Sequence, residues 1–425
     1  MADLNYRRIA PDDSFIGRYL QHNANTETSI EYDFWGSLWL MSTALGRNLI
    51  VDRPSAPVYM NLYVIFVADS GVTRKSTAVR TAAAIASTFV SQLPDDQQPE
   101  VIEGKCTAER LDERLHERSE TTGQASACIS ISELAVFLGT ERYTNNVPGL
   151  LTDLYDCPQS RRSGGTLKRG AVIQHNVFVN FLSASTPAWL LKSVNPTVVQ
   201  GGFTSRCMFV VSERPKSKIA WPTTDGAVVE RTKRLLSDMH TMRYRASDYK
   251  FVTLNEGAMN TFERWYARRV VSVDDYNASF ESRQDAHVLR VAAMLCINDD
   301  SWVVQHTHVQ TAIRIIDDIK SGGSKLFSGG QERNRYILGV EAVRMALIQS
   351  GLDPMPRSKL FLRARYYVDF AEFSAILDVM HEMGAIQRFE MKLNNFGRAV
   401  ELIRATKLLT VKDASQHVLE RIVPT

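Results

Sequence analysis

The segment from Val58 to Ala68 is a nearly continuous run of apolar and aromatic residues, and it constrains the fold more than any other feature. A run without polar alternation predicts a strand buried on both faces, as in the centre of a parallel sheet. The alanine-rich stretch Lys75–Val90 follows and predicts a helix. We therefore expect a layered α/β domain, with a short loop at residues 69–74 between strand and helix.

Further apolar segments extend this domain, which we place at residues 58–222. The predicted strands are Ala127–Ile131, Val177–Leu182 and Cys207–Val211. Residues 1–57 precede the domain as a polar lead-in and a helix rich in tryptophan and leucine, Glu31–Leu45. Residues 223–330 are predicted to be helical, over Val228–His240, Asn255–Val270, Phe280–Cys296 and Thr307–Lys320, with linkers at residues 321–324 and 327–330.

The loop after the first strand carries the residue types of a phosphate-binding site. Backbone N–H groups and a helix N-terminus bind anionic oxygens, a lysine such as Lys75 reaches the terminal phosphates, and a hydroxyl such as that of Ser76 ligates Mg²⁺. Asp69 and Arg74 stand where the standard pattern has glycines. A capped, ordinary helix start remains open as the alternative. The predicted nucleotide-binding residues are Ser70, Gly71, Val72, Thr73, Arg74, Lys75, Ser76 and Thr77.

Polar residues follow the next two strands and precede the last one. Glu133 comes after the second strand, where a carboxylate orders an attacking water, although Ser132 stands where a metal-ordering aspartate is usual. Ser185 and Thr186 follow the third strand as candidate sensors of the terminal phosphate, or form a turn before Pro187. Arg206 precedes the fourth strand and either stabilises transition-state charge or makes a local ion pair.

Taken together, these features resemble a family: the P-loop ATPases of phages, prophages and plasmids described as replicative helicases or primase–helicase C-terminal domains, within the RecA/AAA+ class. The resemblance covers residues 30–300 and rests on the loop and on four further boxes, Ser132-Glu133-Leu134, Leu154-Tyr155-Asp156, Ala184–Pro187 and Gly201–Arg206. It implies ATP and Mg²⁺ at the loop, hydrolysis aided by Glu133, and a homo-oligomeric ring in which Arg206 acts on the neighbouring nucleotide. The departures at Ser132 and in the loop bear on hydrolysis more than on binding.

A basic segment between the second and third strands fits a nucleic-acid motor. It turns at Gly164-Gly165, and a hairpin here would place cations along the phosphate backbone of a nucleic acid. The partner expected first is single-stranded DNA. A solvated basic loop is the alternative. The predicted nucleic-acid contacts are Arg161, Arg162, Lys168 and Arg169.

The C-terminal part, residues 331–425, is predicted to be a winged-helix domain. Helices near Arg335–Gln349 and Phe370–Met383 precede two short strands, Ala385–Phe389 and Ala399–Ile403. Such a domain binds DNA or docks to protein. Upstream, Arg283, His287 and Arg290 recur at helical spacing, which favours packing of a helical lid or an arginine that senses nucleotide.

Composition limits the remaining classes. The net charge of +3 does not by itself indicate a nucleic-acid binder, and the five cysteines form no CxxC pair, so we expect neither zinc nor a disulfide framework. With no apolar N-terminal stretch of signal-peptide length, we expect a cytoplasmic protein without a membrane partner. Two hypotheses remain: an ATP-driven DNA helicase, or a non-hydrolysing DNA-binding replication initiator or loader with a degenerate nucleotide site.

Overall fold

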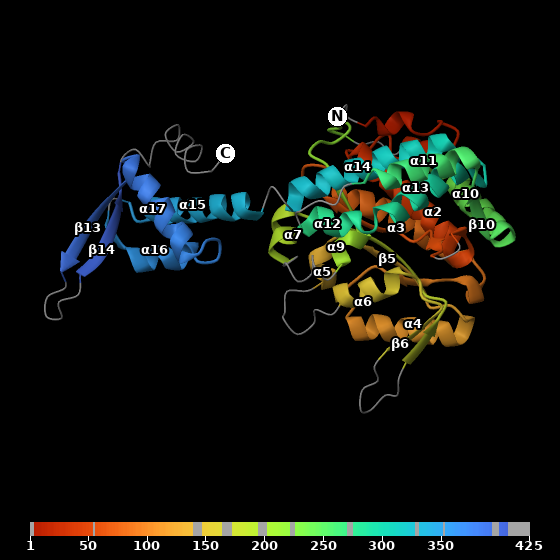
Figure 1. Cartoon of the computed structure of the whole chain (residues 1–425), viewed down its shortest axis with the longest axis horizontal. Helices are drawn as coiled ribbons and strands as arrows, with labels where there is room; N and C mark the ends of the chain where they lie inside the picture. The colour runs from red at the N-terminus through yellow and green to blue at the C-terminus, as the bar shows by residue number, and fades with distance from the viewer. Residues whose placement is uncertain are drawn as a thin grey trace. The chain divides into compact units, whose positions relative to one another are not determined.

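The computed structural model describes the chain at residues 4–53, 56–138, 147–163, 172–193, 202–221, 226–269, 275–327, 331–351, 353–392 and 399–406. The chain divides into two compact units, Met1–Ser324 and Lys325–Thr425 (Figure 1). Three of the segments distinguished in the sequence, 1–57, 58–222 and most of 223–330, thus contribute to a single unit.

A five-stranded sheet forms the centre of the first unit. Its strands lie in the order β4, β5, β8, β3, β9, and every neighbouring pair is parallel. All residues of β3 and β8 are buried, as expected of strands covered on both faces. The predicted α/β fold with a parallel sheet is therefore confirmed. The strands are β4 (Glu100–Ile102), β5 (Ser126–Ile131), β8 (Phe178–Ser185), β3 (Tyr63–Val67) and β9 (Cys207–Val211).

Helices cover both faces of this sheet. The side chain of Asn180 in β8 donates to Trp39 O in α2 at 3.0 Å, whereas the ring of the next residue, Phe181, packs against Phe137 of α5. Successive strand residues point to opposite faces, so α2 and α5 lie on opposite sides. Helix α3 packs beside α2, and α4 and α6 lie on the other side of the sheet (Figure 1). The helices that begin in this unit are α1 (Phe15–His22), α2 (Ile30–Leu45), α3 (Lys75–Ser91), α4 (Ala108–Thr122), α5 (Leu134–Leu138), α6 (Val147–Tyr155), α7 (Pro187–Ser193), α9 (Phe203–Arg206), α10 (Ala227–Tyr249), α11 (Glu256–Ala267), α12 (Asp275–Glu281), α13 (Gln284–Asn298) and α14 (His306–Phe327).

The predicted single strand at Val58–Ala68 is wrong, because the run forms two strands in two sheets. Strand β2 (Val58–Tyr59) pairs antiparallel with β1 (Ile50–Val51), whereas β3 begins at Tyr63 in the central sheet. The buried Asn61 lies at the crossover and donates to Tyr155 O at 2.8 Å, which fixes the backbone there. The second sheet has the order β11 (Val303–Val304), β10 (Phe251–Leu254), β1, β2.

The other strand predictions hold, and two helical predictions need correction. Strands β5, β8 and β9 lie where the sequence places them. The predicted helix Phe280–Cys296 is interrupted, since α12 ends at Glu281 and α13 begins at Gln284. The predicted linker at residues 321–324 is part of α14, where an added Cβ on Gly323 would lie 1.8 Å from the Tyr276 hydroxyl. This glycine therefore allows close packing; residues 328–330 of the second linker lie outside the described residues.

In the second unit, helices and a small sheet enclose a separate core. The order is α15 (Gln331–Gln349), β12 (Met355–Pro356), α16 (Arg357–Ala364), α17 (Phe370–Glu382), β13 (Ile386–Lys392) and β14 (Ala399–Ala405). The strands form an antiparallel sheet in the order β12, β14, β13. Leu360, Phe373 and Leu377 are among the buried residues of its core. The sequence predicts the two outer helices and the hairpin but misses α16 and β12. Across the described parts of both units, none of the helices is long and apolar enough to cross a membrane.

Candidate nucleotide-binding site

The loop at residues 69–74 lies at the carboxyl edge of the central sheet, directly between β3 and α3. Ser70, Gly71 and Val72 are exposed, and Gly71 has a positive φ of 80°. Arg74 is the residue before α3 and is left-handed, with a φ of 48°, a conformation that is uncommon for a residue other than glycine. The loop thus presents its backbone to solvent at a helix start, the arrangement that favours anions.

Tyr32 of α2 contacts both the end of β3 and the loop, and so holds the loop in place. Its hydroxyl donates to Val67 O at 2.8 Å and accepts from the Thr73 hydroxyl at 3.2 Å. Its ring stacks on Phe66, with centroids 4.5 Å apart. Thr73 is fully buried, so its side chain anchors the loop and does not face a ligand. Arg74 is held at the surface by Glu27 at 3.0 Å.

Lys75 and Glu133 approach the same position from two elements. Lys75 is the first residue of α3, and its ammonium donates to Asp69 O at 3.4 Å. Burial lowers the pKa of Lys75, and the carboxylates of Glu133 and Asp69 offset part of that shift. Glu133 follows β5 and is exposed. A cation and a carboxylate therefore share the carboxyl edge of the sheet, where open α/β sheets bind ligands.

Ser76 connects α3 to the end of β5. Its hydroxyl donates to Ser132 O at 3.2 Å, which places it beside Glu133. Mg²⁺ keeps several waters and is held by one or two oxygen ligands together with substrate phosphates. One hydroxyl and one exposed carboxylate fit such an ion. The described residues include no group of three or more histidine, cysteine or acidic side chains that forms a complete metal cage.

Ser185 and Thr186 lie beside the loop at the end of β8. The N–H of Ala68 donates to Ser185 O at 3.4 Å, so the two strand ends are adjacent. Ser185 is buried, and the Thr186 hydroxyl accepts from Trp189 N at 3.3 Å. Thr186 therefore caps α7, which agrees with the alternative of a turn before Pro187. It also lies next to the loop, so its role as a phosphate sensor stays a prediction. Thr77, in the first turn of α3, is half-buried.

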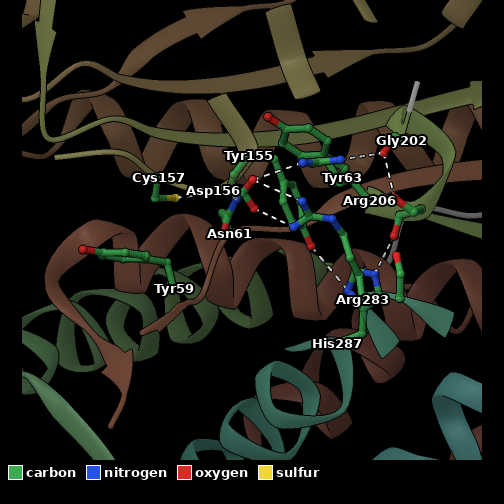
Figure 2. Close-up of polar contacts among 12 residues, drawn as sticks. Tyr59, Asn61, Tyr63, Tyr155, Asp156, Cys157, Gly202, Arg206, Arg283 and His287 are labelled. Carbon is green, nitrogen blue, oxygen red and sulfur yellow. Dashed lines mark hydrogen bonds and ion pairs between the residues drawn. The ribbon is translucent and has the colours of Figure 1, made fainter. Parts of the chain in front are cut away.

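Arg206 lies at the opposite edge of the sheet. It precedes β9, whose first residue Cys207 pairs with Tyr63, whereas the loop follows Val67 at the other end of β3. Arg206 is 8% exposed, and its guanidinium donates to Gly202 O at 2.8 Å and to Asp156 Oδ2 at 3.0 Å (Figure 2). The local ion pair that the sequence left open is thus formed in the single chain, and action on a neighbouring nucleotide stays a prediction.

The basic segment is a hairpin where the structure describes it. Strands β6 (Ser160–Ser163) and β7 (Val172–His175) are antiparallel. Arg161 is largely buried and donates to Asp112 Oδ1 at 2.6 Å, so its charge is neutralised within the chain. Arg162 is exposed. The predicted contacts Lys168 and Arg169 lie outside the described residues.

Comparison with known proteins does not identify a family for this chain. Neither a scan against protein-family models nor a search of curated proteins finds a match for this chain. The function must therefore be argued from the residues and their arrangement.

Sequence reasoning missed two parts of this arrangement. It did not identify Tyr32 as the support of the loop, and it did not connect Asp156 with Arg206 and Arg283. The signal for the first was a tyrosine in the first turn of a helix that is rich in tryptophan and leucine. The signal for the second was the Leu154-Tyr155-Asp156 box, in which a carboxylate follows a buried tyrosine.

Proposed function

We propose that this chain is an ATP-dependent motor on nucleic acid, a DNA replication helicase of the phage type that works as a homo-oligomeric ring. The observation that carries the proposal is the convergence of Lys75, Ser76 and Glu133 at the carboxyl edge of a parallel sheet. The three residues come from two elements that are not neighbours in the sheet, since β8 lies between β3 and β5.

Each of these residues has a task that its position suits. The exposed loop N–H groups and the start of α3 bind the β- and γ-phosphate oxygens of ATP, and Lys75 reaches the terminal phosphate. Ser76 and Glu133 would hold Mg²⁺, which neutralises the charge that develops on the phosphates. Glu133 also orients the attacking water. Ser132 leaves one fewer carboxylate at this edge, which slows hydrolysis more than it weakens binding.

Arg206 suits a role at the contact between two copies. Arg206 precedes Cys207, which lies opposite Tyr63, and its own loop follows Val67, so at least four residue steps, roughly 13 Å at the rise of a β-strand, separate them. Its side chain therefore serves a nucleotide held by another copy. Because Asp156 and Gly202 hold the guanidinium in the single chain, it has to exchange partners when a second copy arrives.

Nucleic acid is the proposed track of the motor. Support comes from the exposed Arg162 of the β6–β7 hairpin and from the second unit, whose helices and antiparallel hairpin have the order of a winged helix. In that unit Arg357 and Arg388 are paired with Glu401 and Asp378, while Lys359 and Arg363 of α16 are exposed. These two exposed cations are therefore the better candidates for phosphate contacts.

ATP turnover with and without single-stranded DNA tests the proposal. Wild-type protein is expected to show turnover that DNA stimulates, Lys75→Ala to lose it, and Lys233→Ala, at an exposed position on α10, to keep it. ATP binding without turnover, together with tight duplex binding by a monomer, would favour the non-hydrolysing initiator or loader. ATP turnover that persists unchanged in Lys75→Ala would contradict both hypotheses, because each of them has ATP bound at the loop that contains Lys75.

A mixing experiment tests the role of Arg206. Lys75→Ala chains keep Arg206, and Arg206→Ala chains keep the loop, so each is expected to be inactive alone. A mixture forms some contacts with both groups intact and is expected to recover part of the wild-type turnover. If Arg206→Ala is fully active alone, the arginine has no part in hydrolysis.

A further inference from the structure

Asp156, directly after α6, joins two arginines that are far apart in the sequence. Its carboxylate accepts from Arg206 at 3.0 Å and from Arg283 at 2.6 and 3.2 Å (Figure 2). Burial raises the pKa of Asp156, but the two guanidiniums outweigh it and hold the pKa below its usual range. Asp156 is therefore a carboxylate bound as an anion between two cationic forks.

Positive charge exceeds negative charge in this cluster. Three guanidiniums, those of Arg206, Arg283 and Arg290, lie 5.1–5.9 Å from the centroid of the Tyr155 ring. His287 does not add to the charge, because burial and the neighbouring arginines lower its pKa to about 3. Of the described residues, Asp156 is the only carboxylate bonded to any of these three arginines.

The three arginines differ in how they are held. Arg290 is buried and bonded to neutral groups, Tyr59 O at 2.7 Å and the Tyr155 hydroxyl at 2.7 Å, so it is fixed in the core. Arg206 and Arg283 share Asp156, whose side chain is 54% exposed. The ion pair that neutralises them is therefore accessible from outside, and another anion can compete for it.

A cavity opens next to this ion pair. It has a volume of about 320 Å³, and Asp156, Arg283, Arg290 and Asn61 are among its lining residues. Arg53 also lines it but is neutralised by Asp285 at 2.9 Å. A phosphate group is small enough for this space, and its oxygens suit two guanidinium forks.

Gly202 contributes to the construction of the site. It is left-handed, with a φ of 79°, and an added Cβ would lie 2.8 Å from Arg206 Nη1. Only glycine combines this backbone conformation with so close an approach of the guanidinium. Its carbonyl then accepts from Arg206 at 2.8 Å and aims the guanidinium at Asp156.

We propose that Arg206 and Arg283 form a phosphate-binding site that the carboxylate of Asp156 fills in the single chain, and that a terminal phosphate presented by a second copy replaces it. The identity of the phosphate donor rests on the proposed function, whereas the anion site rests on the cluster alone. Arg283 thus acts together with Arg206, and Asp156 is a positioning residue that keeps both guanidiniums aligned until the phosphate arrives.

Inorganic phosphate is the probe for the anion site. All measurements use the full chain with Lys75→Ala, which removes the main phosphate ligand of the loop, and follow the rise in melting temperature with phosphate against chloride at equal ionic strength. Adding Asp156→Asn removes the competing charge but keeps an acceptor oxygen, and is expected to tighten phosphate binding about tenfold. The control is Asp153→Asn, an exposed carboxylate on α6, which is expected to change nothing.

Two results would overturn the anion site. One is equal phosphate binding by the Asp156→Asn and Asp153→Asn proteins. The other is tight binding that persists when Arg283→Gln is added to Asp156→Asn. Arg53→Gln serves as the control here, because Arg53 lines the same cavity but is paired with Asp285. The increments are read within each variant, so a lower starting stability does not obscure them.

The phosphate donor is tested with an intact loop. With ATP and Mg²⁺, Asp156→Asn chains are expected to assemble at about tenfold lower protein concentration than wild type, as measured by mass, while Asp153→Asn matches wild type. Unchanged assembly alongside tighter phosphate binding would overturn the second copy as donor. Phosphate binding without any ATP turnover in the wild-type chain would instead reject the proposed function and leave the anion site standing.

Discussion

Replacing His287 with glutamine is expected to remove much of the acid sensitivity of the first unit. His287 is fully buried; its Nε2 lies 2.8 Å from Ser205 O, and its Nδ1 lies 3.3 Å from the Tyr155 hydroxyl. Burial lowers its pKa most, and together with the positive charges of Arg290, Arg283 and Arg206 it brings the pKa from 6.5 to about 3. The folded chain therefore keeps a neutral imidazole where the unfolded chain takes up a proton.

The sign and size follow from proton linkage. Below pH 6.5 the unfolded state binds one more proton than the folded state, so stability falls with pH until the folded pKa of about 3 is reached. Each pH unit in this window costs about 1.4 kcal/mol. Between about pH 7.5 and about pH 5, His287 alone should lower the free energy of unfolding by about 2 kcal/mol. Above pH 6.5 its contribution is complete.

Urea unfolding at the two pH values measures this loss. All six tryptophans lie before residue 303, so their fluorescence reports the first unit. His287→Gln keeps an N–H for Ser205 O but cannot be protonated, so its loss on acidification should be about 2 kcal/mol smaller than that of wild type. His306→Gln, at an exposed position, should match wild type. An unchanged loss in His287→Gln would refute the assignment of a neutral, buried imidazole.

Two further substitutions test the loop support and the close packing of α14. Tyr32→Phe removes the hydroxyl that accepts from Thr73 and should lower the free energy of unfolding by about 1 kcal/mol. It should also weaken ATP binding about tenfold, as measured by calorimetry. An unchanged ATP affinity would contradict the anchoring role of Tyr32. Gly323→Ala drives a methyl group into Tyr276 and should cost about 1–3 kcal/mol in urea unfolding, whereas Gly322→Ala meets only ordinary contacts and should change stability by less than about 1 kcal/mol. Equal effects of the two alanines would argue against the close approach.

Much of the central sheet was predictable because burial on both faces leaves a continuous apolar run. Strands β5, β8 and β9 are of this kind. The change of sheet at Asn61 was not predictable, because a single polar residue in an apolar run is also compatible with an uninterrupted strand. It becomes intelligible only from its bond to Tyr155 O, ninety-four residues away in the sequence.

In the candidate site, too, some contacts could be predicted from the sequence and others could not. Ser76, at the helix start that follows β3, and Glu133, directly after β5, could be placed together because parallel strands share a carboxyl edge. The ion pair of Asp156 with Arg283 spans 127 residues and joins a helix end to the start of another helix, and neither segment shows a periodicity that predicts the contact. Long-range side-chain pairs of this kind are set by packing, not by local pattern.

Calorimetric titration of ATP with Mg²⁺ into wild-type and Lys75→Ala protein tests the central claim most directly, since it measures binding without requiring turnover. Wild type is expected to bind one ATP per chain, and Lys75→Ala to bind at least about tenfold more weakly, because a charged contact to the terminal phosphate is lost. Lys233→Ala should bind as wild type does. Equal ATP affinity in wild type and Lys75→Ala would contradict the claim that this loop holds a nucleoside triphosphate.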